Sequence, residues 1–228
     1  LESAYKNSAK VKPNVILVLV ESLSSYFIQT KAPDGTEYMP YFNSLISQGL
    51  YFSRHYSVSV QTTRGQFAAF CGKIPLYQGL EAADYPTHDF DCLPRYLKKE
   101  GYTSIFMQAF GKQNFDNTHD FLLSQGFDQI PQIAHTCDQE PADVPCWNWG
   151  IQDDDFYRRV FHELKTNEKL AVDKKPFFLA LATITSHMPF KGTPEKLIVH
   201  FKQPHNRLEN YVNTLTVVDN SLEVLIEE

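Results

Sequence analysis

Apolar residues in this sequence form short unbroken runs separated by stretches with helical spacing. The run Val15–Val20 and the run that follows Lys175-Pro176 each come after a Lys-Pro pair and end in polar residues. Such runs are typical of parallel strands buried on both faces, and we expect the first to be a central strand of its sheet. The stretch 102–110 predicts a third strand, and alternating apolar and polar residues over 50–60 predict a fourth.

Apolar residues at helical spacing fill the regions between these strands. Glycines at positions 49, 101 and 126 mark the expected ends of three helices, because glycine readily adopts the left-handed conformation found there. Helices are predicted over 39–49, from Thr62 or Thr63 to Phe70, over 92–101, over 117–126, from Asp153 to Lys165, and over 205–228. The last helix carries the apolar stripe Leu208, Tyr211, Leu215, Val218, Leu222 and Leu225.

This order of elements predicts an α/β fold with a largely parallel central sheet flanked by helices on both faces. Residues 13–228 are expected to form one domain, and residues 1–12 a polar lead-in or linker. The chain ends on a helix that no further strand follows. This is an unusual way for a domain to end.

Composition narrows the class of protein. At 228 residues, of which 43% are hydrophobic, the chain can build a sizeable core. The formal net charge of -6 and the absence of a basic cluster disfavour nucleic acid as a partner. The longest apolar run is far shorter than a membrane-spanning helix requires, and no secretory signal opens the sequence. We expect either a cytosolic protein or an excised part of a longer one.

The four cysteines form no CxxC pair, which makes a zinc site built from them improbable. Cys137 and Cys146 bracket a polar loop that contains two prolines, and a disulfide commonly closes such a loop. The alternative is that these two residues, together with Cys71 and Cys92, are free buried thiols.

Polar residues gather at or just beyond the ends of the predicted strands: Glu21, Thr62-Thr63-Arg64 and Ser186-His187. The carboxyl edge of an open α/β sheet is where ligands bind. A threonine hydroxyl is a weak nucleophile unless a metal or a base lies beside it, and Glu21 could hold that metal. The competing interpretation is that Thr62 or Thr63 only caps a helix, with Gln66 completing a capping box.

Two other groups of residues receive structural interpretations. The three acids Asp153, Asp154 and Asp155 are expected to be helix-start residues, because they lack the glycine and the distal glutamate of a calcium loop. Trp147 and Trp149 are interpreted as packing residues rather than as a substrate platform.

A set of motifs resembles, in order, the extracytoplasmic catalytic domain of the lipoteichoic acid synthases and the phosphoglycerol or phosphoethanolamine transferases. These enzymes belong to the sulfatase and alkaline phosphatase superfamily. The resemblance runs from about Pro13 to the C-terminus. Its motifs are NVILVLVES, MPYFNSLISQGLYFSRHYS, TTRGQFAAFCGKIP, LPRYLKKEGYTSIF, WGIQDDDFY, FFLALATITSHMPF and ENYVNTLTVVD.

The resemblance implies a role for four residues. Glu21 is similar to a carboxylate ligand of one divalent cation, which is manganese, zinc or magnesium. Thr62 is similar to the nucleophile that contacts this metal and accepts the phosphoryl group from a lipid headgroup. His187 is similar to the histidine that contacts the substrate phosphate or headgroup, and Arg64 to an arginine that orients the threonine loop or its anion.

The sequence departs from its relatives at two places. The remaining metal ligands of the family lie in a Gly-Asp-His stretch that would come after Glu228, and a cation held by Glu21 and Thr62 alone would bind poorly. The resemblance therefore implies that this sequence is the N-terminal portion of a domain truncated at its C-terminus, with an incomplete metal site, and that this fragment is inert by itself. Asp116 and Thr118 stand where lipoteichoic acid synthases carry Trp and Arg in a Phe-Trp-Asn-Arg motif, which leaves the substrate's identity open.

The resemblance implies transfer of phosphoglycerol or phosphoethanolamine from a phospholipid donor to a glycan or lipid acceptor. It also implies an extracytoplasmic, periplasmic location, with an anchor in the inner membrane supplied by segments absent from this sequence. The sequence TTRGQ lacks the proline of the sulfatase nucleophile motif, which disfavours sulfate-ester hydrolysis. Two alternatives remain: a phosphodiesterase or phosphatase of the same superfamily, and a noncatalytic binding domain that has lost the metal site.

Overall fold

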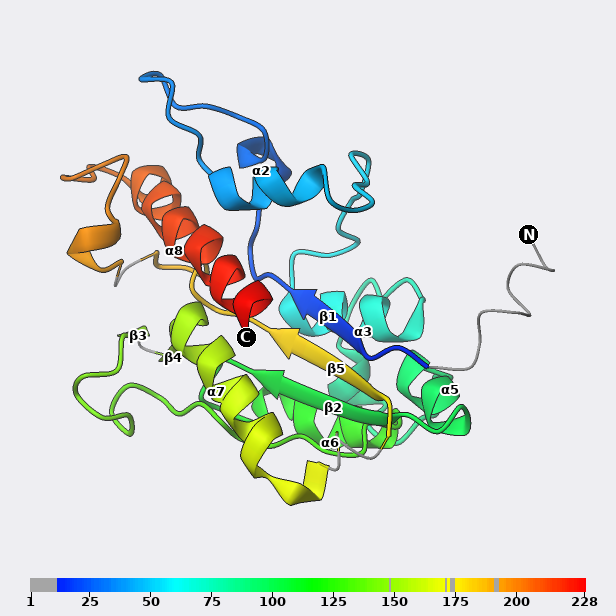
Figure 1. Cartoon of the computed structure of the whole chain (residues 1–228). Helices are drawn as coiled ribbons and strands as arrows, with labels where there is room; N and C mark the ends of the chain where they lie inside the picture. Colours follow the sequence, from blue (N-terminus) through cyan, green and yellow to red (C-terminus); the bar gives the residue numbers. More distant parts are fainter. Residues whose placement is uncertain (1–11, 148, 171, 173–174, 191–192) are drawn as a thin grey trace.

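A parallel three-stranded sheet lies at the centre of the molecule (Figure 1). The computed structural model describes residues 12–147, 149–170, 172, 175–190 and 193–228. The strands β1 (Val15–Leu19), β5 (Phe177–Ala182) and β2 (Thr103–Gln108) lie in the order β1-β5-β2. Both pairings are parallel, so the carboxyl ends of all three strands meet at one edge of the sheet.

Helices cover both faces of this sheet, as the sequence predicts (Figure 1). Side chains of the central strand β5 alternate between two cores: Phe178 and Ala180 pack on one face, and Leu179 and Leu181 on the other. The first core includes side chains of α3 (Thr62–Cys71), α5 (Leu93–Lys99) and α6 (Thr118–Ser124). The second includes side chains of α7 (Asp153–Thr166) and α8 (Arg207–Glu227). The predicted α/β class is therefore confirmed.

The helices match the predicted segments closely, except for the short helix α4 (Glu81–Asp84), which was not predicted. They are α2 (Pro40–Ile46), α3 (Thr62–Cys71), α4 (Glu81–Asp84), α5 (Leu93–Lys99), α6 (Thr118–Ser124), α7 (Asp153–Thr166) and α8 (Arg207–Glu227). The described residues also form a hairpin of two short strands, β3 (Cys146–Trp147) and β4 (Gly150–Ile151). Short 3-10 turns lie at Ser25–Phe27, Phe115–Asn117, Glu168–Leu170 and Glu195–Leu197. No helix in the described part of the chain has the length and apolar character to cross a membrane. The predicted stripe of α8 is buried at Tyr211, Leu215, Val218 and Leu222, whereas Leu208 is exposed.

Two strand predictions are wrong. β1 is not a central strand buried on both faces: within the described residues it pairs only with β5, and Ile16 is 44% exposed. The stretch 50–60 forms no strand either, and Phe52 and Val60 are exposed there. The hydroxyl groups of Ser57 and Ser59 bond to nearby backbone groups, and such local bonds compete with strand pairing.

Two disulfides join the four cysteines. The predicted Cys137–Cys146 bond is present, and a second bond, Cys71–Cys92, ties the end of α3 to the residue before α5. The alternative of four free thiols is therefore wrong. The proposed lead-in over 1–12 lies outside the described residues, apart from Lys12.

A buried carboxylate on α8 caps the start of α2. Met39 is the N-cap of α2 and makes no side-chain capping bond. Asp219 replaces that cap, since its two carboxylate oxygens accept the N–H groups of Tyr41 at 2.9 Å and Phe42 at 2.8 Å. The side chain is nearly inaccessible, and this burial raises the pKa of Asp219. The contact fixes α2 on α8.

Replacing Asp219 with alanine should lower the free energy of unfolding by about 3 kcal/mol, because two N–H groups lose a charged acceptor. Urea unfolding followed by circular dichroism, with both disulfides intact, measures this change. Glu223→Ala, on the exposed side of the same helix, is the matched control and should change stability by less than about 0.5 kcal/mol. Equal stabilities of the two variants would contradict the capping role.

Candidate active site

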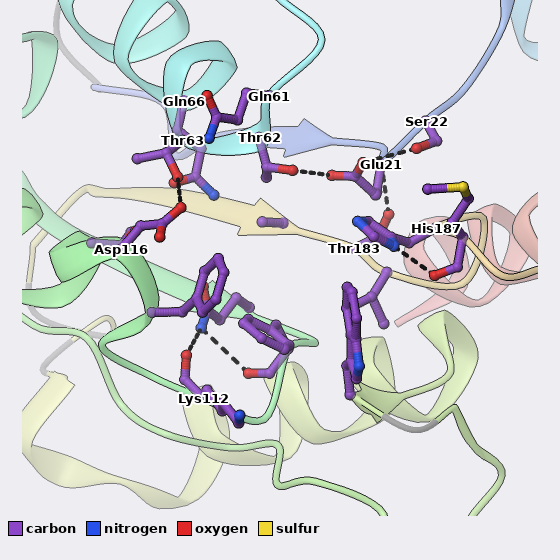
Figure 2. Close-up of a pocket in the computed structure, with 18 of the residues that line it drawn as sticks. Glu21, Ser22, Gln61, Thr62, Thr63, Gln66, Lys112, Asp116, Thr183 and His187 are labelled. Carbon is purple, nitrogen blue, oxygen red and sulfur yellow. Dashed lines mark hydrogen bonds between the residues drawn. The ribbon is translucent and has the colours of Figure 1, made fainter. Parts of the chain in front are cut away.

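A cavity of about 630 Å³ opens at the carboxyl edge of the sheet (Figure 2). Its polar side includes Glu21, Thr62 and Thr63, and its aromatic side includes Phe110 and Trp149. The position agrees with the general location of ligand sites in open α/β sheets. The cavity is therefore the candidate active site.

The backbone of Glu21 is held on both sides by residues that follow β5. Glu21 donates its N–H to Thr183 Oγ1 at 3.0 Å, and Ser186 donates its hydroxyl to the Glu21 carbonyl. The next residue, Ser22, has a φ of 53°, a left-handed conformation that costs free energy for a residue with a side chain. Its hydroxyl donates to Glu21 Oε1 at 2.8 Å, which leaves Oε2 for the cavity.

Thr62 and Glu21 meet at the polar side, as the sequence predicts (Figure 2). The Thr62 hydroxyl donates to Glu21 Oε2 at 3.0 Å. Thr62 is the first helical residue of α3, so the prediction that Thr62 or Thr63 is the N-cap is wrong; the N-cap is Gln61, without a side-chain bond. The Thr62 hydroxyl is therefore engaged with the acid rather than with its own helix. Its role as a nucleophile and the role of Glu21 as a ligand stay predictions.

Arg64 points away from this pair. Its guanidinium donates to the carbonyl of Gly79 at 2.7 and 3.2 Å and to the carbonyl of Tyr77 at 3.5 Å. It does not line the described cavity. Of the two roles implied by the resemblance, these contacts favour orientation of the loop that carries Thr62 over contact with an anion.

His187 lines the cavity near Glu21 (Figure 2). Its Nδ1 lies 2.8 Å from the carbonyl oxygen of Met188, and because a carbonyl only accepts, Nδ1 carries the proton. In the neutral ring, the other nitrogen, Nε2, is then an acceptor. The ring also packs against Trp149, with centroids 4.8 Å apart. This placement agrees with the predicted substrate contact, which stays a prediction.

The donor set at the polar side suits a divalent cation in kind but not in number. Glu21 and Thr62 supply a carboxylate and a hydroxyl oxygen, which are ligands that such cations accept. Zinc takes at least four ligands, and magnesium takes six. Among the described residues, no group of three or more His, Cys, Asp or Glu side chains is placed to hold a metal ion.

The cavity includes residues whose position the sequence does not indicate. Asp116 lines it and accepts the Thr63 hydroxyl at 3.4 Å. Trp147 is buried and packs as predicted, but Trp149 differs from its prediction, because it is 45% exposed and lines the cavity. The spacing of the two tryptophans does not predict this difference in exposure. The hairpin buries the Trp147 side chain in the core and leaves that of Trp149 partly exposed.

Asp153 fixes the segment after β5, residues 183–186, which bonds to the backbone of Glu21. It is the first residue of α7, as predicted, but it is fully buried. Its Oδ1 accepts the N–H groups of Ile184 and Thr185, both at 3.0 Å, and Thr185 Oγ1 accepts the Asp153 N–H at 2.9 Å. Its Oδ2 has no hydrogen-bond partner among the residues that the structure describes. Burial raises the pKa of this carboxyl to about 6.

Comparison with known proteins identifies the family. Residues 13–228, almost the whole chain, match the protein family described as sulfatase. The chain belongs to the sulfatase family. The family description does not by itself assign sulfate-ester hydrolysis to this member, because one fold hosts several reactions.

This sulfatase-family chain is similar to lipoteichoic acid synthases and related proteins. It is 27% identical to the lipoteichoic acid synthase of Staphylococcus saprophyticus over 233 residues, which cover 98% of this chain and 34% of the relative. The structure of the lipoteichoic acid synthase LtaP from Listeria monocytogenes matches with a TM-score of 0.81 at 20% identity, covering 94% of this chain and 51% of that one. The Streptococcus pyogenes phosphoglycerol transferase GacH, in complex with sn-glycerol-1-phosphate, matches with a TM-score of 0.61 at 16% identity, covering 94% and 56%.

The buried carboxyl of Asp153 makes the stability of this sulfatase-family chain depend on pH. Because its pKa rises from 3.8 to about 6 on folding, the folded state binds more protons than the unfolded state between these values. This contribution to stability is therefore full below pH 4 and is lost as the pH rises to about 6, by about 3 kcal/mol.

Asp153→Asn removes this titration and keeps the Oδ1 acceptor. The stability of the wild-type chain relative to Asp153→Asn should thus fall by about 3 kcal/mol between pH 4 and pH 7. Urea unfolding of both proteins across this range measures the difference, and groups that titrate in both proteins cancel. Parallel stability curves would show that Asp153 does not titrate as described.

Proposed function

We propose that this chain is part of a metal-dependent phosphotransferase. The enzyme moves a phosphoglycerol or phosphoethanolamine group from a phospholipid to a glycan or lipid acceptor through a phospho-threonine at Thr62. The observation that carries this proposal is the 3.0 Å hydrogen bond from the Thr62 hydroxyl to Glu21 Oε2 inside the cavity. The similarity to lipoteichoic acid synthases supports phosphoglycerol transfer as the reaction class.

The start of α3 suits a phosphate group. The first N–H groups of a helix have no acceptor within it, and the helix dipole adds a partial positive charge there. Thr62 occupies this first turn, so a phosphate that its hydroxyl attacks lies next to free backbone donors. His187 lines the same cavity, which supports a contact between its side chain and the headgroup.

The first chemical step joins Thr62 Oγ1 to the phosphorus of the donor, and the bond from phosphorus to the diacylglycerol oxygen breaks. The hydroxyl proton, which points at Glu21 Oε2, ends on the departing diacylglycerol oxygen. A divalent cation held by Glu21 and Thr62 would lower the pKa of the hydroxyl and neutralise phosphate charge. The acceptor hydroxyl then takes the phosphoryl group from Thr62.

An extracytoplasmic location is part of the proposal. Two disulfides and no free cysteine among the described residues support an oxidising compartment. The chain spans about a third of the length of the curated relatives it matches. We propose that other segments of the full-length protein form the membrane anchor and hold the domain near its lipid donor.

Thr62→Ala in the full-length protein should lower release of diacylglycerol from phospholipid vesicles by about a thousandfold or more, because the nucleophile is lost. Thr62→Ser keeps a hydroxyl and should retain measurable turnover. Both variants should unfold near the wild-type temperature, since the Thr62 side chain is exposed. Mass spectrometry of the trapped wild-type enzyme should locate the phosphoryl adduct on Thr62, and wild-type turnover of Thr62→Ala would remove this residue from the mechanism.

The same assay separates the proposal from its alternatives. A transferase makes a new phosphodiester with the acceptor, whereas a phosphodiesterase releases the free headgroup phosphate whether or not an acceptor is present. A noncatalytic binding domain releases no diacylglycerol under either condition.

A further inference from the structure

An aromatic wall lies within the cavity that contains Thr62 and Glu21. Trp149 is 45% exposed and Phe115 is 52% exposed, and both line the cavity. Phe110 lies between them, with its ring centroid 5.4 Å from Phe115 and 6.1 Å from Trp149. The chemistry at Thr62 and Glu21 does not use this wall.

The backbone holds Trp149 rigidly in this position. Its carbonyl accepts the N–H of Gly111 at 2.7 Å, and the buried ring of Trp147 packs edge-on against its ring at 5.1 Å. The next residue, Gly150, lies so close to the end of β2 that a Cβ there would come within 2.0 Å of the carbonyl oxygen of Ala109, the residue after the strand. The hairpin thus presents a half-exposed indole on a backbone that is bonded to this segment, and such a fixed position lowers the entropic cost of binding.

The cavity is larger than the headgroup that the proposed reaction transfers. Its volume of about 630 Å³ lies within the range of sites that hold ligands of several rings, whereas phosphoglycerol and phosphoethanolamine are three- and two-carbon groups. Lys112 lies across the cavity from Thr62 and Glu21 (Figure 2). The space beside the aromatic wall therefore remains for a second substrate with both apolar and hydrogen-bonding surfaces.

We propose that Trp149 is the platform of an acceptor subsite on which a sugar ring stacks. A sugar ring has a face of C–H groups that suits an indole and a rim of hydroxyls that suits polar groups such as that of Lys112. The proposal rests on the proposed transferase function and specifies its acceptor as a glycan. A sugar hydroxyl forms the new bond to phosphorus, the bond from phosphorus to Thr62 Oγ1 breaks, and the hydroxyl proton returns to Thr62.

The ratio of transfer to hydrolysis, measured with the full-length protein, tests this subsite. Cellobiose, gentiobiose and chitobiose serve as acceptor probes, and glycerol serves as the acceptor without a ring. At equal hydroxyl concentration, the wild type should transfer to at least one disaccharide better than to glycerol. Headgroup release from the donor by the wild type tests the proposed function separately.

Two apolar substitutions isolate the aromatic ring. Trp149→Leu should lower the ratio of disaccharide transfer to hydrolysis by about fivefold or more, whereas Trp149→Phe should keep at least half of the wild-type ratio. Phe52→Ala, an exposed aromatic outside the cavity, is the matched control and should leave the ratio unchanged. Equal ratios in the Leu and Phe variants, or a wild type that prefers glycerol, overturn the proposal.

Fluorine NMR provides a second measurement that needs no turnover. In full-length protein labelled with 5-fluorotryptophan, the resonance missing from Trp149→Phe belongs to Trp149. A shift of this resonance on addition of a disaccharide, but not of glycerol, supports the subsite. A shift of this resonance with phospholipid vesicles alone would show that the aromatic wall binds the lipid, and it would overturn the proposal. The absence of any shift would overturn it as well.

Discussion

The candidate site depends on the hydrogen bonds that fix Glu21 at the carboxyl edge of the sheet. A parallel pairing brings the ends of β1 and β5 side by side, so that the Thr183 and Ser186 hydroxyls reach the two backbone polar groups of Glu21. With the backbone held on both sides, the direction of the carboxylate is set by the sheet rather than by a mobile loop. A helix that begins beside this edge can then place a hydroxyl against the acid, as α3 does with Thr62.

Buried carboxylates fix the elements that support this arrangement. Asp153 ties the start of α7 to the segment after β5, and Asp219 ties the start of α2 to α8. In each case, two backbone N–H groups donate to the acid, and burial still raises its pKa. Burial of these two carboxylates costs electrostatic free energy. Their hydrogen bonds fix the positions of the helices and of the segment around the site.

The sequence predicts those features that depend on local pattern. The apolar runs and the glycine ends of the helices suffice to predict the α/β class and the two helical layers. Glu21 and Thr62 meet as expected, although the strand predicted just before Thr62 is absent from the described residues. The sequence does not reveal features set by partners distant in the chain. The stretch 50–60 alternates like a strand, but no strand in the described part of the chain pairs with it. The Cys71–Cys92 bond joins two segments that only the fold brings together.

The two sides of the cavity have different origins, and this difference bears on specificity. The side with Glu21 and Thr62 is fixed by the end of a strand and the start of a helix, which are regular elements of the fold. The other side comes from the loop after β2, with Asp116, and from the hairpin that carries Trp149. Functional variation on a shared scaffold concentrates in such loops. We therefore expect the reaction class to follow from the sheet edge, and the choice of headgroup and acceptor to follow from the loop after β2 and the hairpin that carries Trp149.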